Sequence, residues 1–452
     1  MQAILADGST VTCSDTPFAE GGDGILFFSS DGVSVIKLYK TPEPWRIHAT
    51  EAVLNRFNAV KEHTYWEQFF AWPNAMVIKP SVGIRMRKIA EQRPMSHFVN
   101  WKFRSRLLQP QDRGSWQGYV AAAIKVARLV KRLHQFGLCH SDLSENNIFL
   151  NPVNGQVTLL DCDGLVVPDQ LPPVVIGTRG YMAPEIVTGA AAPSIDADLH
   201  ALAVVIYRLL FIIDPFRGPK KHHNDPAIDD ELMYGQKALF IEHPTDHSNR
   251  PASNFPSTRL LGEGVHKLFQ RTFVEHLKNP SRRPRAAEWE RALIQMYDRI
   301  VPCANPTCVF KSFALLEQSP CCPWCKTPMR HPSGQIPLLH LYKKVGKTWD
   351  REGSYTIIGS EGRTLHTWHA NSSASPGPTT DAAVQAQIMY DSGSRTWRIN
   401  NYNLRSLSRM TSPPQREPLG TGFSHALHKG DMLILDDKEN ARIAYVDFLR
   451  LP

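Results

Sequence analysis

The sequence predicts an α+β protein of several domains. Residues 1–90 alternate β-branched and aromatic residues with glycine turns, which is typical of strands. Further along, to residue 300, apolar residues recur at helical spacing, and past Pro302 a cysteine cluster is followed by short strand-like runs. At 452 residues the chain is too long for one ordinary domain. The expected domains are a strand-rich lobe at 1–90, a helix-rich lobe at 91–300, a small metal-binding ribbon at 301–335 and a β-sandwich at 336–452.

The composition is that of a soluble globular chain, with 42% hydrophobic and 21% charged residues. The net charge of +8 suits an acidic partner or a nucleotide, but no long Lys/Arg block specifies nucleic acid. The first residues lack the pattern of a secretory signal, and the longest apolar stretch, 201–213, is too short to span a bilayer. Five of the eight cysteines lie within 303–325, which favours metal binding in a reducing compartment. We therefore expect a cytoplasmic protein with no membrane contact.

Helical periodicity predicts one helix in the first lobe and four in the second. These helices are expected at 47–60, 116–136, 195–213, 264–278 and 286–300.

A glycine-rich turn and a strand lysine are the first candidate site residues. Gly21, Gly22 and Gly24 lie between two strand-like runs, where glycines let a hairpin backbone approach phosphates closely. Lys37 lies in an apolar strand, and an inward-facing lysine there needs an anionic partner. Phosphate groups and a helical carboxylate, for which we propose Glu51, would satisfy it. A glycine hairpin of no special function and an exposed helical acid remain the alternatives for these two features.

The strongest signal is the polar loop that follows the apolar helix ending at Gly137. Asp142 and Asn147 lie five residues apart in this loop and can face one site. The carboxylate can accept a hydroxyl proton while the amide oxygen holds a metal ion. Asp161 follows the apolar strand 157–160 and offers a second hard-oxygen ligand for magnesium.

In order and spacing these residues resemble the protein kinase family. The loop 140–147 (HSDLSENN) resembles its catalytic loop, and 161–164 (DCDG) resembles a variant of its metal-binding D-F-G motif. Residues 177–185 (GTRGYMAPE) resemble the end of an activation segment. Asp198 resembles the buried aspartate that opens the central helix, and Arg283 resembles the arginine that pairs with the glutamate ending that segment, here Glu185.

The resemblance implies a bilobal protein kinase fold and transfer of the γ-phosphate of ATP to Ser/Thr hydroxyls of a protein substrate. Thr178 favours Ser/Thr over Tyr specificity, because the family threonine contacts the catalytic aspartate. The implied roles are proton acceptance by Asp142, magnesium binding by Asn147 and Asp161, phosphate binding by Lys37 and the turn containing Gly21, Gly22 and Gly24, and orientation of Lys37 by Glu51.

Three positions depart from the family pattern. Ser141 replaces the arginine that receives a phosphorylated activation segment, which implies activity without that phosphorylation. Ser144 replaces the lysine that steadies the γ-phosphate, which implies slower transfer or help from another group. Asp163 occupies the place of the D-F-G glycine. We assign magnesium to Asp161 from the strand register, with Asp163 as the alternative.

The cysteine cluster predicts a structural zinc site. Cys303 and Cys308 form one pair and Cys322 and Cys325 a second, and thirteen residues separate the two pairs. Such paired knuckles suit tetrahedral thiolate coordination of Zn²⁺ in a small ribbon, with Cys321 as an alternative to Cys322.

The last hundred residues alternate like a β-sandwich and loosely resemble a forkhead-associated domain at 358–359, 400–401 and 429–431. The arginine and serine that read phosphothreonine in that family have no clear counterpart, since Arg363 lies late and 408–409 lie too far along.

The whole arrangement resembles bacterial kinases linked to tellurite-resistance gene clusters. The resemblance implies two partners, a von Willebrand A-type (TerY-like) protein and a metal-dependent phosphatase. The main alternative is a pseudokinase scaffold that works through its C-terminal domains. A nucleic-acid-binding regulator lacks a supporting set of aromatic and basic residues. Phosphorylation of a small molecule is a further alternative, against which 177–185 favours a peptide substrate.

Overall fold

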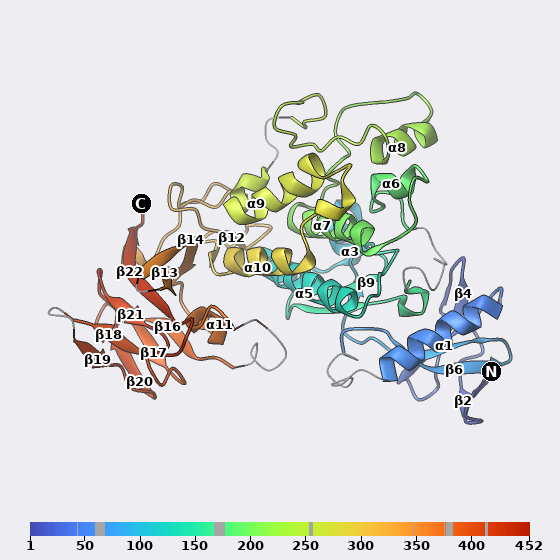
Figure 1. Ribbon diagram of the computed structural model, residues 1–452, viewed down its shortest axis with the longest axis horizontal. Coiled ribbons are helices and arrows are strands. Elements are labelled where there is room, and N and C mark those ends of the chain that lie inside the picture. Colours follow the sequence, from blue (N-terminus) through green and yellow to red (C-terminus); the bar gives the residue numbers. More distant parts are fainter. Residues whose placement is uncertain are drawn as a thin grey trace. The chain divides into compact units, whose positions relative to one another are not determined.

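The computed structural model describes the chain except residues 43, 59–67, 167–176, 253–255, 347, 375, 377–382 and 412–414. The chain mixes helices and strands, as the α+β prediction requires (Figure 1). Its contacts define two compact units, one of residues 1–257 and 266–291, the other of 258–265 and 292–452. None of the helices in the described residues is long and apolar enough to cross a membrane.

The first unit begins with a seven-stranded antiparallel sheet in the order β2-β1-β6-β7-β5-β4-β3. The strands are β1 (Gln2–Leu5), β2 (Thr10–Thr12), β3 (Ala19–Glu20), β4 (Gly24–Phe28), β5 (Ser34–Tyr39), β6 (Pro73–Lys79) and β7 (Gly83–Arg87). Ile36, Leu38 and Val77 belong to the buried core of this sheet. The glycine turn joins β3 to β4, and the Gly21 N–H donates to the Gly24 carbonyl at 2.9 Å. Helix α1 (Pro44–Asn58) lies against β6.

The helix-rich part of the chain is built around α5 and α7, which pack side by side (Figure 1). Ser115 and Ser194 cap the first turns of these two helices by accepting from backbone N–H groups. The helices are α3 (Ser96–Val99), α4 (Trp101–Leu107), α5 (Trp116–Gln135), α6 (Pro184–Val187), α7 (Ile195–Phe211), α8 (Pro226–Tyr234), α9 (Glu263–Gln270) and α10 (Ala286–Tyr297).

Two predicted helices end earlier than expected. The helix predicted at 264–278 changes at Arg271 into a π-helical turn, Arg271–Glu275. The helix predicted to reach residue 300 ends at Tyr297, and Ile300 begins strand β11. Strand pairing with β12 accounts for the second difference, because it takes up backbone groups that would otherwise extend the helix.

A short sheet positions the polar loop described above. Strands β9 (Ile148–Asn151) and β10 (Gln156–Leu159) form an antiparallel hairpin, and β8 (Arg93–Pro94) pairs with β9 on the other side. The loop 140–147 therefore leads into β9, while Asp161 follows β10. In an antiparallel pair one strand begins where its neighbour ends, and Ile148 at the start of β9 lies opposite Leu159 at the end of β10. The loop 140–147 and Asp161 therefore lie next to each other.

The second unit is rich in β structure. It contains a two-stranded sheet, β11-β12, a six-stranded sheet, β14-β13-β22-β21-β18-β19, and a four-stranded sheet, β15-β16-β17-β20. Alternate residues of β17 are buried, including Trp397 and Ile399, as expected for a sheet with one packed face. The elements are β11 (Ile300–Pro302), β12 (Ser312–Ala314), β13 (Gln335–Val345), β14 (Thr348–Ile358), β15 (Arg363–Leu365), α11 (Thr367–Ala370), β16 (Ala386–Asp391), β17 (Thr396–Asn401), β18 (Ser408–Met410), β19 (Arg416–Pro418), β20 (Phe423–Ala426), β21 (Met432–Ile434) and β22 (Arg442–Arg450).

Asp298, just beyond α10, is part of the buried interior of the second unit. Its carboxylate accepts a hydrogen bond from the Tyr355 hydroxyl at 2.8 Å and lies 3.1 Å from His369 Nε2. Burial opposes the charge of Asp298, but His369, Arg363 and Tyr355 together hold its pKa below the usual value. The contacts of the chain divide the two units at residue 292, inside α10, so Asp298 belongs to the second unit. The ribbon was predicted to begin at residue 301. The predicted lobe and ribbon boundaries remain predictions.

A buried ion pair links three segments of the first unit. Arg283 is fully buried and binds both carboxylate oxygens of Glu185, at 2.7 and 2.8 Å. Its guanidinium also donates to the carbonyl groups of Asp196 and Leu277. The predicted pairing of Arg283 with Glu185 is confirmed, and it fixes the start of α6 against the start of α7.

We expect Glu185→Gln to lower the free energy of unfolding by about 3 kcal/mol, because it leaves the buried Arg283 without its counter-ion. This loss corresponds to a fall in Tm of roughly 6–12 °C for a unit of this size. Thermal unfolding of the full chain measures it, with Arg282→Met, at an exposed neighbouring position, as the control. Equal melting temperatures for Glu185→Gln and the control would show that the pair does not stabilise the unit.

Candidate active site

A cavity of about 410 Å³ lies between the sheet and the β9–β10 hairpin of the first unit. Its glycine and polar lining residues are Gly21, Asp23, Gly24, Lys37, Arg87, Lys88, Asn147, Asp161 and Asp163. Its apolar wall includes Leu26, Val35, Ala71, Met86, Phe149 and Leu160. Gly22 lies in the same turn but outside the lining of the cavity. An apolar slot bordered by charged groups fits a ligand that joins a flat ring to an anionic tail.

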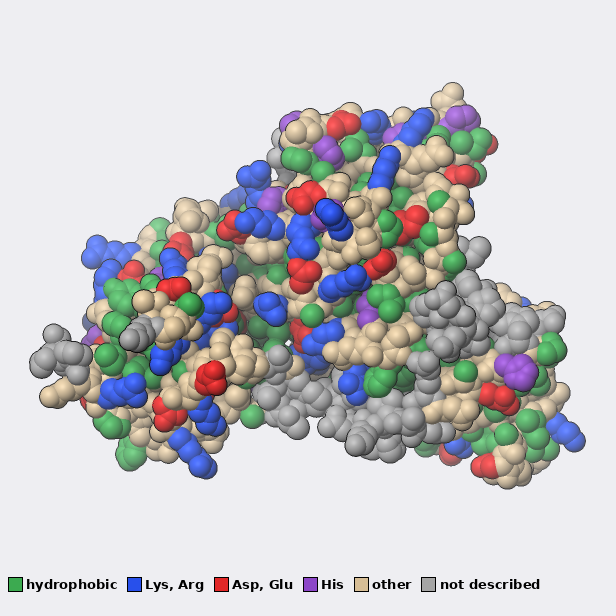
Figure 2. Space-filling model, viewed as in Figure 1, with side chains coloured by type: hydrophobic (Ala, Val, Ile, Leu, Met, Phe, Trp, Pro, Cys, Tyr) green, Lys and Arg blue, Asp and Glu red, His purple; other side chains and the backbone are tan. Residues whose placement is uncertain are grey.

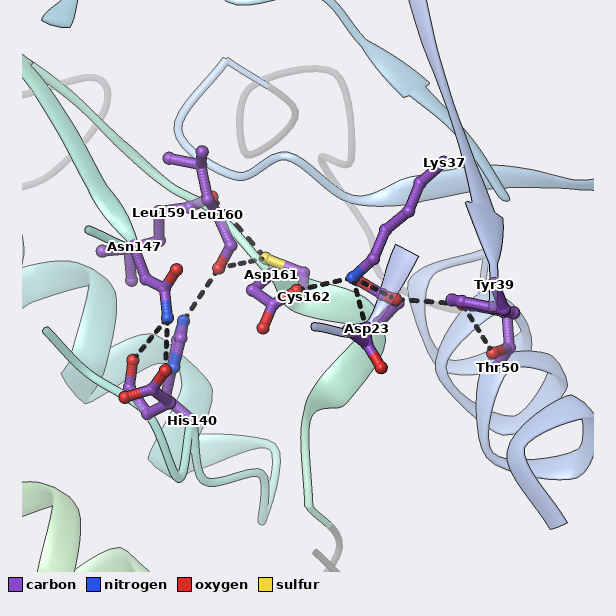
Figure 3. Close-up of polar contacts among 12 residues, drawn as sticks. Asp23, Lys37, Tyr39, Thr50, His140, Asn147, Leu159, Leu160, Asp161 and Cys162 are labelled. Atoms are coloured by element: carbon purple, nitrogen blue, oxygen red, sulfur yellow. Dashed lines mark hydrogen bonds and ion pairs between the residues drawn. The ribbon is translucent and has the colours of Figure 1, made fainter. Parts of the chain in front are cut away.

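Lys37 lies among three aspartates, of which Figure 3 labels Asp23 and Asp161. Its Nζ lies 2.8 Å from Asp161 Oδ1, 3.0 Å from Asp163 Oδ2 and 3.0 Å from Asp23 Oδ2. The lysine side chain is only 7% exposed, and burial opposes its charge. The carboxylates of Asp163, Asp161 and Asp23 nevertheless raise the pKa of Lys37 well above its usual value. Lys37 is therefore a fixed cation at neutral pH.

Glu51 does not take part in this cluster, so the prediction that it orients Lys37 is wrong for this structure. Its side chain is 52% exposed and lies 3.7 Å from His48 Nδ1. The neighbouring residue, Thr50, is buried, as are Ala49 and Val53 of the same helix. Successive helical residues point about 100° apart, so an inward Thr50 turns Glu51 toward solvent. Sequence periodicity does not fix this rotation of α1 relative to the sheet.

Tyr39 and Thr50 are site residues that the sequence analysis missed. The Tyr39 hydroxyl donates to Asp163 Oδ2 at 2.9 Å and lies 3.2 Å from the Thr50 hydroxyl (Figure 3). Tyr39 stands two residues after Lys37 in β5, so both side chains leave the same face of the strand. This spacing was visible in the sequence and could have marked Tyr39.

The two aspartates of the predicted metal loop have different surroundings. Asp161 adopts a left-handed conformation, with φ of 56°, and its side chain is 29% exposed at the cavity. The Asp163 side chain is 1% exposed and accepts hydrogen bonds from Lys37 and Tyr39. Burial raises the pKa of Asp163 against the opposing charge of Lys37. Asp161 thus offers an accessible carboxylate, whereas that of Asp163 is enclosed by protein groups.

Asp142 and Asn147 lie together, as their spacing predicts. Asn147 Nδ2 donates to Asp142 Oδ2 and to the Asp142 carbonyl, each at 2.9 Å. The backbone N–H of Thr178 donates to Asp142 Oδ1 at 2.7 Å, so Thr178 contacts the aspartate through its backbone amide. Because Asn147 uses its amide nitrogen in these bonds, its oxygen is the atom suited to a metal ion.

Asp198, in α7, binds the backbone of the loop 140–147. Its carboxylate accepts the backbone N–H groups of His140, at 2.7 Å, and Ser141, at 3.1 Å. His140 Nε2 lies 2.9 Å from the carbonyl oxygen of Leu160, the residue before Asp161. Ser141 has a φ of 61°, a left-handed conformation that these bonds stabilise. The bond between His140 and Leu160 thus connects the loop 140–147 to the segment that begins at Asp161.

The four predicted zinc ligands come together in the second unit. The Sγ atoms of Cys303, Cys308, Cys322 and Cys325 all lie within 4.8 Å of one another, and Cys321 is not part of this group. Although burial raises it, hydrogen bonding to Thr327 and to neighbouring thiols lowers the pKa of Cys325 to about 6. Four convergent sulfur atoms form a donor set that fits tetrahedral Zn²⁺.

The two arginines considered as phosphothreonine readers are engaged in internal contacts. Arg363 is buried and donates to the carbonyl groups of Ile358 and Ile300. Arg409 pairs with Asp431 at 3.2 Å and donates to the carbonyl of Ala426 at 2.6 Å.

On the face drawn in Figure 2, basic side chains are interspersed with acidic ones.

Comparison with known proteins supports the assignment of the helix-rich segment. Residues 98–290 match the protein kinase domain family. Calcium-dependent protein kinase 22 of Oryza sativa subsp. japonica is 31% identical over 176 residues, which cover 36% of this chain and 29% of that protein. Serine/threonine-protein kinase PSK2 of Saccharomyces cerevisiae is 27% identical over 111 residues, or 24% of this chain and 10% of that protein. Serine/threonine-protein kinase PknD of Chlamydia abortus is 31% identical over 117 residues, or 21% and 12%.

The chain therefore contains a protein kinase domain that has serine/threonine kinases among its relatives. It spans less than a third of the length of each of these three relatives. The family match begins at residue 98 and does not include the glycine turn or Lys37. The place of these residues at the site rests on the cavity and the ion pairs.

Proposed function

We propose that the chain is an ATP-dependent protein kinase that transfers the γ-phosphate of Mg-ATP to Ser/Thr hydroxyls. The observation that carries this proposal is the convergence of Lys37, Asn147 and Asp161 on one cavity, with Asp142 hydrogen-bonded to Asn147 at its edge. These four residues supply the cation, the metal ligands and the proton acceptor that phosphoryl transfer uses, on a chain with a protein kinase domain.

The residues around the cavity fit Mg-ATP. Asn147 and Asp161 present hard oxygens that would hold Mg²⁺. Lys37 and the Gly21–Gly24 turn would hold phosphates, and the apolar wall would hold the base. When bound, Mg-ATP supplies the phosphoryl group and a metal ion that neutralises its charge.

Asp142 would orient the substrate hydroxyl and accept its proton. The N–H groups of Thr178 and Asn147 hold its two carboxylate oxygens in place. Thr178 belongs to the segment 177–185, so this segment begins beside Asp142. The buried Arg283 binds Glu185 and so fixes the other end of the segment. A segment held in this way suits an extended peptide better than a small molecule.

The alternative is a pseudokinase scaffold, and one observation favours it. Ser144 is fully buried and is not among the residues that line the cavity, so the position of the missing lysine offers no cation there. The retained Lys37, Asp142, Asn147 and Asp161 favour catalysis. A cytoplasmic location, a von Willebrand A-type protein and a metal-dependent phosphatase remain proposals from the family resemblance.

Asp142→Ala and Asp161→Ala should each reduce phosphoryl transfer by at least about 100-fold, since one removes the proton acceptor and the other a metal ligand. Only Asp161→Ala should weaken Mg-ATP binding strongly. Transfer from labelled ATP and calorimetric titration with Mg-ATP measure the two effects. Transfer by Asp142→Ala at the wild-type rate would refute its role. A wild-type protein that binds Mg-ATP without transfer would favour the pseudokinase.

We further propose that Cys303, Cys308, Cys322 and Cys325 bind one structural zinc ion in a small ribbon beside the β-rich region, a region proposed to be forkhead-associated-like. The support is the convergence of the four sulfur atoms.

Freshly purified protein should contain one zinc ion per chain, and Cys308→Ser should lower this content. Cys321→Ser is the matched control and should keep the full content, since Cys321 lies outside the group. Because structural zinc contributes on the order of 10 kcal/mol to such a unit, a chelator should melt the ribbon first and spare Mg-ATP binding. Elemental analysis that finds no zinc would refute the site.

A further inference from the structure

We propose that Asp163 is the positioning residue that holds Lys37 in place for the phosphates of ATP, the role that the sequence predicts for Glu51. This inference rests on the nucleotide-binding part of the proposed function. It assigns Asp163 neither to magnesium, the alternative raised by the sequence, nor to a merely structural role.

The three carboxylates around Lys37 differ in what else they face. Asp23 belongs to the glycine turn that lines the cavity, and Asp161 is partly exposed to the same cavity. A bound metal ion would draw Asp161, and bound phosphates would approach the turn. Asp163 also borders this cavity, but its side chain is only 1% exposed. It is therefore the partner that can stay with Lys37 when the cavity is filled.

Both oxygens of Asp163 are used to grip Lys37. Oδ2 lies 3.0 Å and Oδ1 3.3 Å from Lys37 Nζ. Tyr39, on the same strand as Lys37, donates to Oδ2 at 2.9 Å. A carboxylate held at both its oxygens has one orientation, and it fixes the ammonium group that it binds.

The backbone of the metal loop makes this arrangement possible. Asp161 has a φ of 56°, and the Gly164 N–H donates to the Asp161 carbonyl at 3.2 Å across the single turn η2 (Cys162–Gly164). In this tight turn both Asp161 and Asp163 reach Lys37, although they stand two residues apart. The same short loop thus offers one carboxylate to the cavity and another to the lysine.

Helix α1 contributes to Lys37 through uncharged groups. The buried Thr50 hydroxyl lies 3.2 Å from the Tyr39 hydroxyl, which in turn binds Asp163. The charged Glu51 is turned to solvent. Among the side chains that the structure describes, the position of Lys37 therefore depends on the loop 161–164 and not on a charge of α1.

The test compares Mg-ATP with adenosine, which lacks phosphates, by calorimetric titration of the full chain. Asp163→Asn keeps the shape of the side chain and removes its charge. It should raise the Kd of Mg-ATP about tenfold, because Lys37 is no longer held against the phosphates. The Kd of adenosine should change less than about twofold, since the apolar wall is intact. Glu51→Gln, the control on α1, should leave both values within about twofold.

A double-mutant cycle separates positioning from metal binding. If Asp163 acts through Lys37, then Asp163→Asn should have little further effect on Mg-ATP binding in a Lys37→Met background. A tenfold loss that persists in that background and depends on magnesium concentration would overturn the proposal and make Asp163 a metal ligand. An unchanged Kd for Asp163→Asn would overturn it as well.

Tyr39→Phe keeps the proposal testable if Asp163→Asn does not fold, since it removes one hydrogen bond and no charge. It should weaken Mg-ATP by about threefold and leave adenosine unchanged; no change in Mg-ATP would overturn the proposal. The variants could show these changes in Kd while the wild-type protein transfers no phosphate. That result would support the positioning role and refute the kinase activity. Wild-type protein that binds neither ligand would overturn both.

Discussion

The buried ammonium group of Lys37 is the constraint on which the site depends. A cation removed from water needs compensating charge, and here three aspartates provide it. Asp23 comes from the β3–β4 turn, and Asp161 and Asp163 come from the short loop that follows β10. The requirement for charge compensation therefore brings these two segments to strand β5, which carries Lys37. The cavity exists where it does because the sheet supplies the lysine and the hairpin supplies two of its partners.

The same rule of compensated charge recurs wherever irregular backbone borders the site. Asp198 accepts two backbone N–H groups of the loop that carries Asp142. Arg283 neutralises Glu185 at the end of 177–185. Well-packed apolar residues would stabilise these places equally well, but they would not specify one geometry for loops. Polar contacts therefore define the loops, while the apolar faces of α5 and α7 supply most of the core of this part of the unit.

The sequence predicted what depends on local pattern and missed what depends on packing. Helical periodicity located α5 and α7 to within two residues of their observed bounds, and motif spacing brought Asp142 next to Asn147. The same information could not choose between Thr50 and Glu51, because the rotation of α1 is set by contact with the sheet. Strand register favoured Asp161 over Asp163 as the metal ligand but left Asp163 as the alternative, because the sequence does not display the difference in their burial. The π-helical turn after Gln270 is a further consequence of packing that periodicity does not encode.

The contacts of two arginines, Arg363 and Arg409, bear on whether the β-rich region can bind phosphate through them. The Arg363 guanidinium donates hydrogen bonds to carbonyl groups of its own unit, and Arg409 forms an ion pair with Asp431. Binding a phosphate through either would require breaking internal contacts, and for the buried Arg363 it would also require exposing a guanidinium that now supports the segment after α10. Phosphopeptide recognition through these two side chains is therefore disfavoured on energetic grounds. Arg363 instead acts with Asp298 as part of a polar interior that fixes residues 297–300 to the sheets. Arg363, which was weighed as a phosphothreonine reader and found to lie too late in the chain, is thus part of the structural framework, and Asp163, the alternative magnesium ligand, is bound to a lysine.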